Sequence, residues 1–527
     1  MPSRHDSIGI SSLVLKKLQK LSARIKKRGS NGPDDAQVRV VPFSPISPIG
    51  HLPVEILEEV FLLVIPSELS LARNVAVLHL CSVSCLWRRA AMAMPSIWTS
   101  LTIRLPAVPN SKASSENQSF WTIVKGWIEC ARGLPLSLLL VESPQCSAPA
   151  PCFPCGQLRT NVLQGYFKMV EHLEGLTPHL FKSLSSQTFD GLHSLVCDLT
   201  RYNGQPKFLA SITRLAPNLR RISLDSPSNH DLSFSNIQAS IQIWKQITHL
   251  STRTFNSTML LDVLRACPSL QGAVFHCDTD PWLPSTSSTP LVHGAPSPFT
   301  LPDLTTLTIV LYRGRALNSG IFRDMNTPAL RTFRLGSFHQ SDFGFDYRSL
   351  EDLDHVHKGM RHLRRLSIFF SHLSERGLVE LLLQLSDLEE LDIQDCKDFD
   401  RFFSELNRTQ EISVIPLLPR LRLLSLDFRE VPRESIDNED LACFLQSRLG
   451  LEGPEFAGPH ALQTLVFLSG PAAQKYRSLT SPANGTWLKD MAVQFLFWDA
   501  NTGCRGSRWK YRLRSDLEEG NWIEGVR

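Results

Sequence analysis

The residues best spaced to bind a metal are Cys146 and the run Cys152-Phe-Pro-Cys155. A Cys-x-x-Cys pair can supply two thiolates to zinc, but a structural zinc site takes four ligands. No second pair follows at zinc-ribbon spacing, and prolines interrupt the run. We therefore interpret it as a loop with incidental thiols, and we expect no metal and no other cofactor.

Residues that could do catalytic chemistry are scattered. The 16 histidines show no metal-ligand spacing, and His355 and His357 are interpreted as surface histidines. The sequence contains no Gly-rich phosphate loop, no His-Glu-x-x-His and no Gly-x-Ser-x-Gly, which are motifs of phosphate binding, metalloprotease and hydrolase chemistry. The sequence therefore predicts that the protein is not an enzyme.

A repeated pattern, Leu-x-x-Leu-x-Leu, recurs between residues 192 and 467. Clear copies begin at Leu219, Leu304, Leu330, Leu363, Leu388, Leu421 and Leu462, and weaker ones at Leu192, Ile247 and Leu270. Apolar helical segments lie between copies at residues 259–267, 378–385 and 441–448. A strand followed by a helix, repeated, predicts a parallel sheet with helices on its outer face.

The copies from Leu304 onward are spaced 26, 33, 25, 33 and 41 residues apart. This resembles irregular leucine-rich repeats, whose regular period is roughly 20–29 residues. The predicted fold class is α/β, a small helical module followed by an irregular leucine-rich-repeat solenoid with parallel strands inside and helices outside.

The third and fifth positions of the motif alternate with core residues, so their side chains point to the other face of the sheet. On that face Arg334 and Arg365 are basic, and Glu390 and Asp392 are acidic. A face of mixed sign suits a charged protein surface or peptide better than DNA. These four are the candidate target-binding residues; the alternative is that they are ordinary solvated sheet residues.

Residues 51–105 predict a small helical module. Pro53 suits a first helical turn, apolar residues recur at helical spacing from Ile56 to Val64, and a second helical stretch is expected from Leu71 to Met94. Three short helices in about 50 residues make a small core. We therefore expect the module to expose apolar surface that a partner covers.

Three elements of this module resemble an F-box in order and spacing. They are Leu52-Pro53-x-Glu55-Ile56-Leu57-x-x-Val60-Phe61, Val83-Ser84-x-x-Trp87-Arg88 and Pro95-x-x-Trp98. The later run Trp127-Ile-Glu-Cys-Ala-Arg-Gly-Leu-Pro-Leu-Ser-Leu138 resembles a segment that follows the F-box in a large family of filamentous-fungal F-box proteins.

The resemblance implies the substrate-recognition adaptor of an SCF (cullin–RING) ubiquitin ligase. The F-box would bind a Skp-family adaptor and, through it, cullin and a RING protein, while the repeats hold a target protein. The implied adaptor-binding residues, some of which must also form the module's own core, are Leu52, Pro53, Ile56, Leu57, Val60, Phe61, Val83 and Trp87. The alternative is a repeat-type interaction scaffold that does not recruit cullin.

The positive charge is concentrated at the N-terminus. Residues 1–30 hold eight Lys or Arg and one Asp, a net +7, whereas the whole chain of 527 residues is +4, so the other 497 residues sum to −3. Residues 11–28 predict a basic amphipathic helix, for which nuclear import, a membrane surface, an organelle presequence and a solvated tail all stay open. We expect no nucleic-acid partner for the folded part and no membrane span.

The length of 527 residues predicts several domains or a long repeat array. The expected divisions are a basic tail and linker (1–50), the F-box (51–105), a transition region (106–190), the repeats (191–475) and a C-terminal cap or tail (476–527). Cys81, Cys197 and Cys267 lie among apolar residues and are expected to be buried free thiols, which favours a cytoplasmic or nuclear location.

Overall fold

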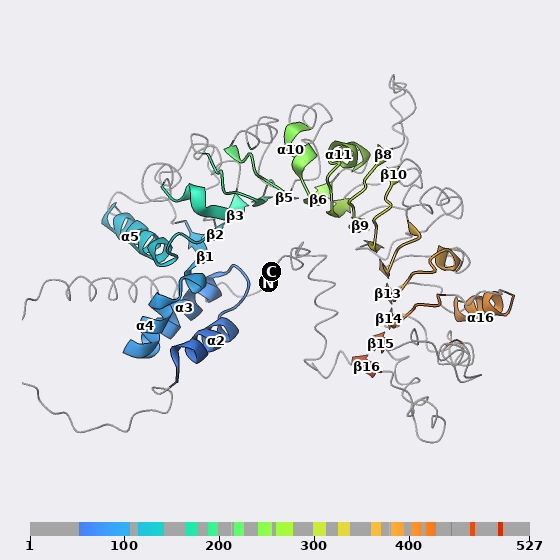
Figure 1. The fold of residues 1–527 in the computed structure, drawn as a ribbon, viewed down its shortest axis with the longest axis horizontal. Coiled ribbons are helices and arrows are strands. Elements are labelled where there is room, and N and C mark those ends of the chain that lie inside the picture. The colour runs from blue at the N-terminus through green and yellow to red at the C-terminus, as the bar shows by residue number, and fades with distance from the viewer. Residues whose placement is uncertain are drawn as a thin grey trace, which may run out of the picture. The chain divides into compact units, whose positions relative to one another are not determined.

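The computed structural model describes the chain in segments (Figure 1). These are residues 52–105, 114–141, 165–176, 188–198, 212, 215–225, 241–255, 260–277, 299–311, 325–337, 360–369, 379, 381–394, 402–412, 418–427, 444, 464–468 and 494–498. The basic helix predicted over residues 11–28, the Cys146–Cys155 run, His355 and His357 lie outside them. The chain divides into two compact units, residues 1–202 with 207–219, and residues 203–206 with 220–527.

The first unit begins with the predicted helical module. Its elements are α2 (Val54–Val64), α3 (Leu71–Val83), α4 (Cys85–Ala93) and the 3-10 helix η2 (Pro95–Trp98). The single helical stretch expected from Leu71 to Met94 is wrong, because Ser84 is extended and separates α3 from α4. Its hydroxyl accepts a hydrogen bond from the Trp87 amide at 3.1 Å, which caps α4.

A parallel sheet with a covering helix follows the module. Its elements are β1 (Ser100–Arg104), α5 (Ser114–Cys130), β2 (Leu136–Val141), η4 (Phe167–Met169), β3 (Val170–Leu176) and β4 (Ser194–Asp198). The four strands lie side by side in chain order, each parallel to the next. The weaker copy of the repeat motif at Leu192 forms β4, whereas β3 carries no copy.

Buried Trp98 joins the helical module to α5. Its indole N–H donates to the carbonyl of Ala91 in α4 at 2.7 Å. The indole of Trp127 in α5 donates in turn to the Trp98 carbonyl at 3.0 Å, and the two rings meet edge to face at 4.7 Å. Both indoles are buried with their polar group satisfied, so Trp98 fixes where the module lies against the following helix.

Asn74 of α3 covers the free edge of β1. Its amide donates to the Thr102 carbonyl at 2.7 Å, and its carbonyl accepts from the Thr102 amide at 3.2 Å. Among the described strands β1 has only β2 as a neighbour. One side chain thus takes the place of a further strand at an edge that would otherwise expose its backbone groups.

We expect Asn74→Ala to lower the free energy of unfolding of this unit by about 1–3 kcal/mol, since it leaves two part-buried backbone groups without their partner. The measurement is urea unfolding of the full chain, followed by tryptophan fluorescence. His79→Ala, at an exposed position of the same helix, is the matched control and should change stability by less than about 0.5 kcal/mol. Equal stability of the two variants would contradict this role of Asn74.

The second unit is built around a longer parallel sheet. Its strands are β5 (Arg221–Asp225), β6 (His249–Phe255), β7 (Gly272–Cys277), β9 (Thr306–Leu311), β11 (Thr332–Ser337), β12 (Arg365–Phe369), β13 (Glu390–Gln394), β14 (Leu423–Asp427), β15 (Thr464–Leu468) and β16 (Gln494–Trp498). They lie side by side in that order, all parallel. Two short strands, β8 (Phe299–Thr300) and β10 (Met325–Asn326), form a separate pair.

Each predicted copy of the repeat motif forms a strand that begins at the third motif position. The first, fourth and sixth positions form the core: Leu363, Leu366 and Ile368 of β12, for example, are all buried. The helices of this unit are α10 (Ile241–Gln246), α11 (Leu260–Ala266) and α16 (Phe402–Ile412), and they lie on the outer side of the strands (Figure 1). The predicted α/β fold of parallel strands inside and helices outside is confirmed.

Candidate functional site

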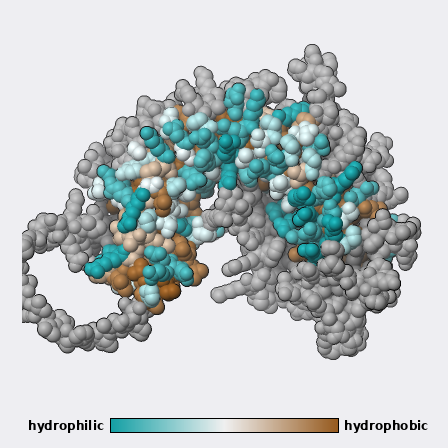
Figure 2. Space-filling model, viewed as in Figure 1, coloured by the Kyte–Doolittle hydropathy of each residue, from teal (hydrophilic) through white to brown (hydrophobic). Residues whose placement is uncertain are grey.

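The helical module carries a large exposed apolar surface. We call it the apolar face; it consists of Leu52, Val54, Ile56, Leu62, Leu63, Val64, Leu71 and Val83, all exposed in the structure. Figure 2 shows it as a brown area over α2 and its neighbours. Leu63 alone keeps 86% of its surface exposed. Contiguous apolar surface of this kind on a folded protein marks an interaction site.

The cause of this exposure is that α2 carries apolar residues on more than the one side that packs against the module, while Glu55, Glu58 and Glu59 share a further side. Leu57 and Phe61 lie one turn apart and are fully buried in the module, and the Phe61 ring packs 5.3 Å from that of Trp87. The inward side of α2 is therefore already occupied. The outward apolar residues Leu62, Leu63 and Val64 therefore stay exposed, with no cover from the described part of the chain.

The structure sorts the eight residues for which the resemblance implies adaptor contact. Leu57 and Phe61 belong to the module's core, Val60 and Trp87 are half-buried, and Leu52, Pro53, Ile56 and Val83 are exposed. Sequence reasoning missed three exposed members of the apolar face, Leu62, Leu63 and Val64, of which Leu63 is the most exposed residue of the whole face. Their signal is the unbroken run Phe61-Leu-Leu-Val64, because four consecutive helical residues cannot all face one core.

The predicted buried thiols are confirmed. Cys81, Cys197 and Cys267 are buried and form no disulfide. Burial raises the pKa of Cys81 to about 11 and raises the pKa of Cys267 as well. The thiolate form is therefore scarce at neutral pH, and these cysteines serve as core residues.

The structure brings the four target-binding candidates onto three neighbouring strands. Arg334 lies on β11, Arg365 on β12, and Glu390 and Asp392 on β13. Arg365 pairs with Glu390 through two contacts, Nε to Oε2 at 2.6 Å and a guanidinium N–H to Oε1 at 2.7 Å. This is the bidentate geometry that gives arginine its specificity for carboxylates.

Fifth-position side chains are more buried than the sequence suggests. Ser251, Thr308, Ser367, Asp392 and Ser425 are all buried. Asp392 is therefore neither an ordinary solvated sheet residue nor exposed to a target in this structure, and the assignment of the four residues to target binding stays a prediction. Exposed polar side chains lie instead at the second position, as with Gln271, Arg331 and Arg364, while third-position side chains are half-buried.

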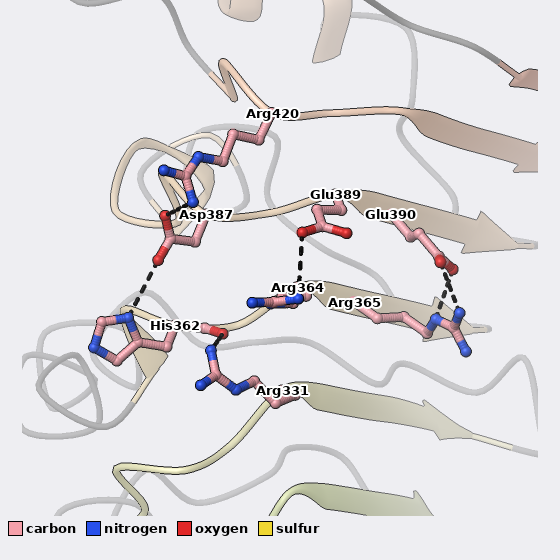
Figure 3. A network of polar contacts seen from close by, with 8 residues as sticks. All are labelled: Arg331, His362, Arg364, Arg365, Asp387, Glu389, Glu390 and Arg420. Atoms are coloured by element: carbon pink, nitrogen blue, oxygen red, sulfur yellow. Dashed lines mark hydrogen bonds and ion pairs between the residues drawn. The ribbon is translucent and has the colours of Figure 1, made fainter. Parts of the chain in front are cut away.

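A network of ion pairs lies where β12 and β13 begin (Figure 3). Asp387 contacts His362 at 3.2 Å and Arg420 at 2.8 Å, and Arg364 contacts Glu389 at 3.7 Å. Arg331 donates to the His362 carbonyl at 3.4 Å. Sequence reasoning missed this network because it considered only the third and fifth motif positions.

His249 of β6 makes stability depend on pH. Burial, aided by the positive charge of Arg221, lowers its pKa to about 4 from an ordinary 6.5. The unfolded chain therefore binds the extra proton between these values, so stability is complete above pH 6.5, falls as the pH drops toward 4, and loses nothing more from this group below that. We expect His249→Gln to flatten this part of the profile, measured by urea unfolding above and within the window. Parallel profiles for the two chains would contradict the assignment.

Within the residues that the structure describes, no three His, Cys, Asp or Glu side chains gather closely enough to hold a metal ion. In the same residues, no helix combines the length and apolar character needed to cross a membrane.

No protein-family model and no curated protein matches the chain. The solved structures similar to it include TLR13 in a complex with ssRNA13 (15% identity, 66% of this chain and 44% of that one, TM-score 0.29) and the internalin InlF of Listeria monocytogenes (13%, 63% and 82%, 0.28). The LRIM1/APL1C complex is a third (13% identity, 69% and 60%, 0.25). The chain spans less than half of the first of these structures.

Proposed function

We propose that the protein is the substrate-recognition adaptor of an SCF (cullin–RING) ubiquitin ligase, acting in the cytoplasm or the nucleus. The helical module would bind a Skp-family adaptor, and the repeats would bind a target protein. The chain would act by tethering, which raises the concentration of the target near the ubiquitin-loaded partner enzyme. The covalent bond would be formed by the ligase partners.

The observation that carries this proposal is the apolar face. It lies on the segment whose motifs resemble an F-box, and it leaves three consecutive apolar residues, Leu62, Leu63 and Val64, exposed on one helix. The resemblance supplies the occupant of that face, a Skp-family adaptor. Burying these side chains contributes roughly 1.5–3 kcal/mol each, which suits a stable complex.

The repeats support the second half of the proposal. Parallel strands present a broad sheet face whose polar side chains stand at regular register positions. Arg365 and Glu390 show that arginine forks and carboxylates meet there. Such a surface suits recognition of another protein.

The experiment that tests the ligase assignment is co-purification of the tagged full chain with a Skp-family adaptor and cullin. The proposal predicts that the chain retains both, and that cullin is lost when the adaptor is left out. Retention of the adaptor without cullin would favour the alternative, a repeat scaffold that does not recruit cullin. Retention of neither would contradict the proposal.

A further inference from the structure

Arginines gather where strands β11 to β14 begin. We call this group the arginine strip; it consists of Arg331, Arg361, Arg364, Arg365, Arg420 and Arg422. Figure 3 shows four of them, Arg331, Arg364, Arg365 and Arg420, at the starts of neighbouring strands.

Backbone hydrogen bonds fix the alignment of the strip. The amide of Arg364 donates to the Arg331 carbonyl, that of Glu389 to Arg364, and that of Arg422 to Glu389, each at 2.8 Å. These four residues therefore stand in one line across four strands, with neighbours about 4.8 Å apart. The line spans roughly 14 Å, which is the length of four or five residues of an extended peptide.

The strip is basic after its internal ion pairs are counted. Three acids stand among the six arginines, Asp387, Glu389 and Glu390, and each is paired with an arginine of the strip. Six positive and three negative charges leave a net +3 with His362 neutral. The side chains of Arg361 and Arg422 are exposed and make no hydrogen bond or ion pair with another described residue.

The arginines also lie outside their acidic partners. Arg364 keeps 56% of its side chain exposed against 29% for Glu389, and Arg420 keeps 52% against 26% for Asp387. The acids thus lie beneath the guanidinium groups and hold them in place. What faces solvent is a row of N–H donors arranged to receive anionic oxygens.

The strip lies on these four repeats. At the second and third motif positions, which hold Arg331, Arg364, Arg365 and Arg422 in the strip, β6, β7 and β9 carry no arginine, whereas β5 carries Arg220 and Arg221. Arginine is therefore concentrated on β11 to β14 and, among the other strands compared, recurs only on β5.

We propose that the arginine strip binds an extended, carboxylate-rich segment of a protein. This rests on the proposed function, since the segment would belong to the target that the repeats hold. Arginine forks bind carboxylates bidentately, as Arg365 does with Glu390. A carboxylate is favoured over a phosphate as the bound group because the structure already holds one on the strip in bidentate geometry, that of Glu390 on Arg365.

The test is fluorescence anisotropy of the full chain with a labelled peptide in which glutamate alternates with alanine. The same peptide with glutamine in place of glutamate should bind about tenfold more weakly or not at all, and added salt should weaken the glutamate peptide. The double variant Arg361→Glu with Arg422→Glu should lose about tenfold in affinity. Its matched control is Arg220→Glu with Lys245→Glu, which reverses two exposed charges of the same unit outside the strip and should stay within about twofold.

A further variant separates binding from a merely structural role. Glu389→Gln removes the anion that competes for Arg364, so it should strengthen peptide binding by about threefold. If the ion pairs only stabilised the fold, the same variant would leave binding unchanged or weaken it. Unchanged binding of the double variant, or equal binding of the glutamine peptide, would overturn the proposal.

Two further probes test the class of ligand. A phosphoserine peptide that binds while the glutamate peptide does not would overturn the assignment to carboxylates. A polyuridine RNA that binds more tightly than the glutamate peptide would overturn the assignment to protein. Binding of the Skp-family adaptor, measured on the same protein samples, distinguishes the two proposals. If the chain binds the adaptor but not the peptide, only the proposal for the arginine strip is refuted. If the chain does not bind the adaptor, the ligase assignment is refuted.

Discussion

Leu63→Asp should abolish binding of the chain to a Skp-family adaptor, with a loss of affinity of about a hundredfold or more. Leu63 is the most exposed residue of the apolar face, so in the complex its carboxylate replacement would be buried without a partner. Removing a hot-spot side chain near the centre of an interface lowers the binding free energy by about 2 kcal/mol or more. Burying an unpaired charge there lowers it further. Titration of the purified full chain with purified adaptor measures the effect.

The fold should tolerate this change. The side chain of Leu63 contacts little of its own chain, and a negative charge near the end of α2 costs only about 0.3–1 kcal/mol through the helix dipole. Ser96→Asp is the matched control, because it adds the same charge at an exposed position of the module outside the apolar face. It should leave affinity unchanged. Loss of affinity in both variants, or in neither, would contradict the role assigned to Leu63.

Phe61→Ala should give the opposite pattern, a loss of stability of about 3–5 kcal/mol. Phe61 is fully buried and packs against Trp87. Removing its ring therefore leaves a cavity in a core that consists of few residues. Urea unfolding followed by tryptophan fluorescence and circular dichroism measures the loss.

Phe61→Leu is the control for volume. It keeps an apolar side chain in the same place and should cost less than about 1.5 kcal/mol. Loss of adaptor binding in Phe61→Ala would reflect an unfolded module, so this residue alone cannot define the interface. Phe61→Ala with unchanged stability would place Phe61 outside the core.

The repeats were predictable from the sequence because each strand carries its own signal. The copy at Leu363, for instance, became β12 with its strand starting at the third motif position, as the alternation of core and surface residues requires. Strand β3 (Val170–Leu176) was missed because it carries no copy of the motif. Helix α16 (Phe402–Ile412) was missed although its buried residues Phe402, Phe403 and Leu406 recur at helical spacing.

The helical module shows what could not be predicted from the sequence. The apolar residues from Val54 to Val64 predict a helix, but its two apolar sides can be told apart only when the partners of each side chain are known. Phe61 faces Trp87, a residue of another helix, whereas Leu63 faces solvent. The arginine strip could not be predicted for the same reason. Its alignment depends on the register between strands that lie 25 or more residues apart in the sequence.

Hydrogen–deuterium exchange of the full chain, with and without a purified Skp-family adaptor, tests the central claim most directly. The claim is that the apolar face of the helical module is the adaptor-binding surface. It predicts slower exchange in α2 and at the start of α3 when the adaptor is present, with strands β5 to β14 unchanged. No change in α2 at saturating adaptor, or slower exchange in the repeats instead, would contradict it.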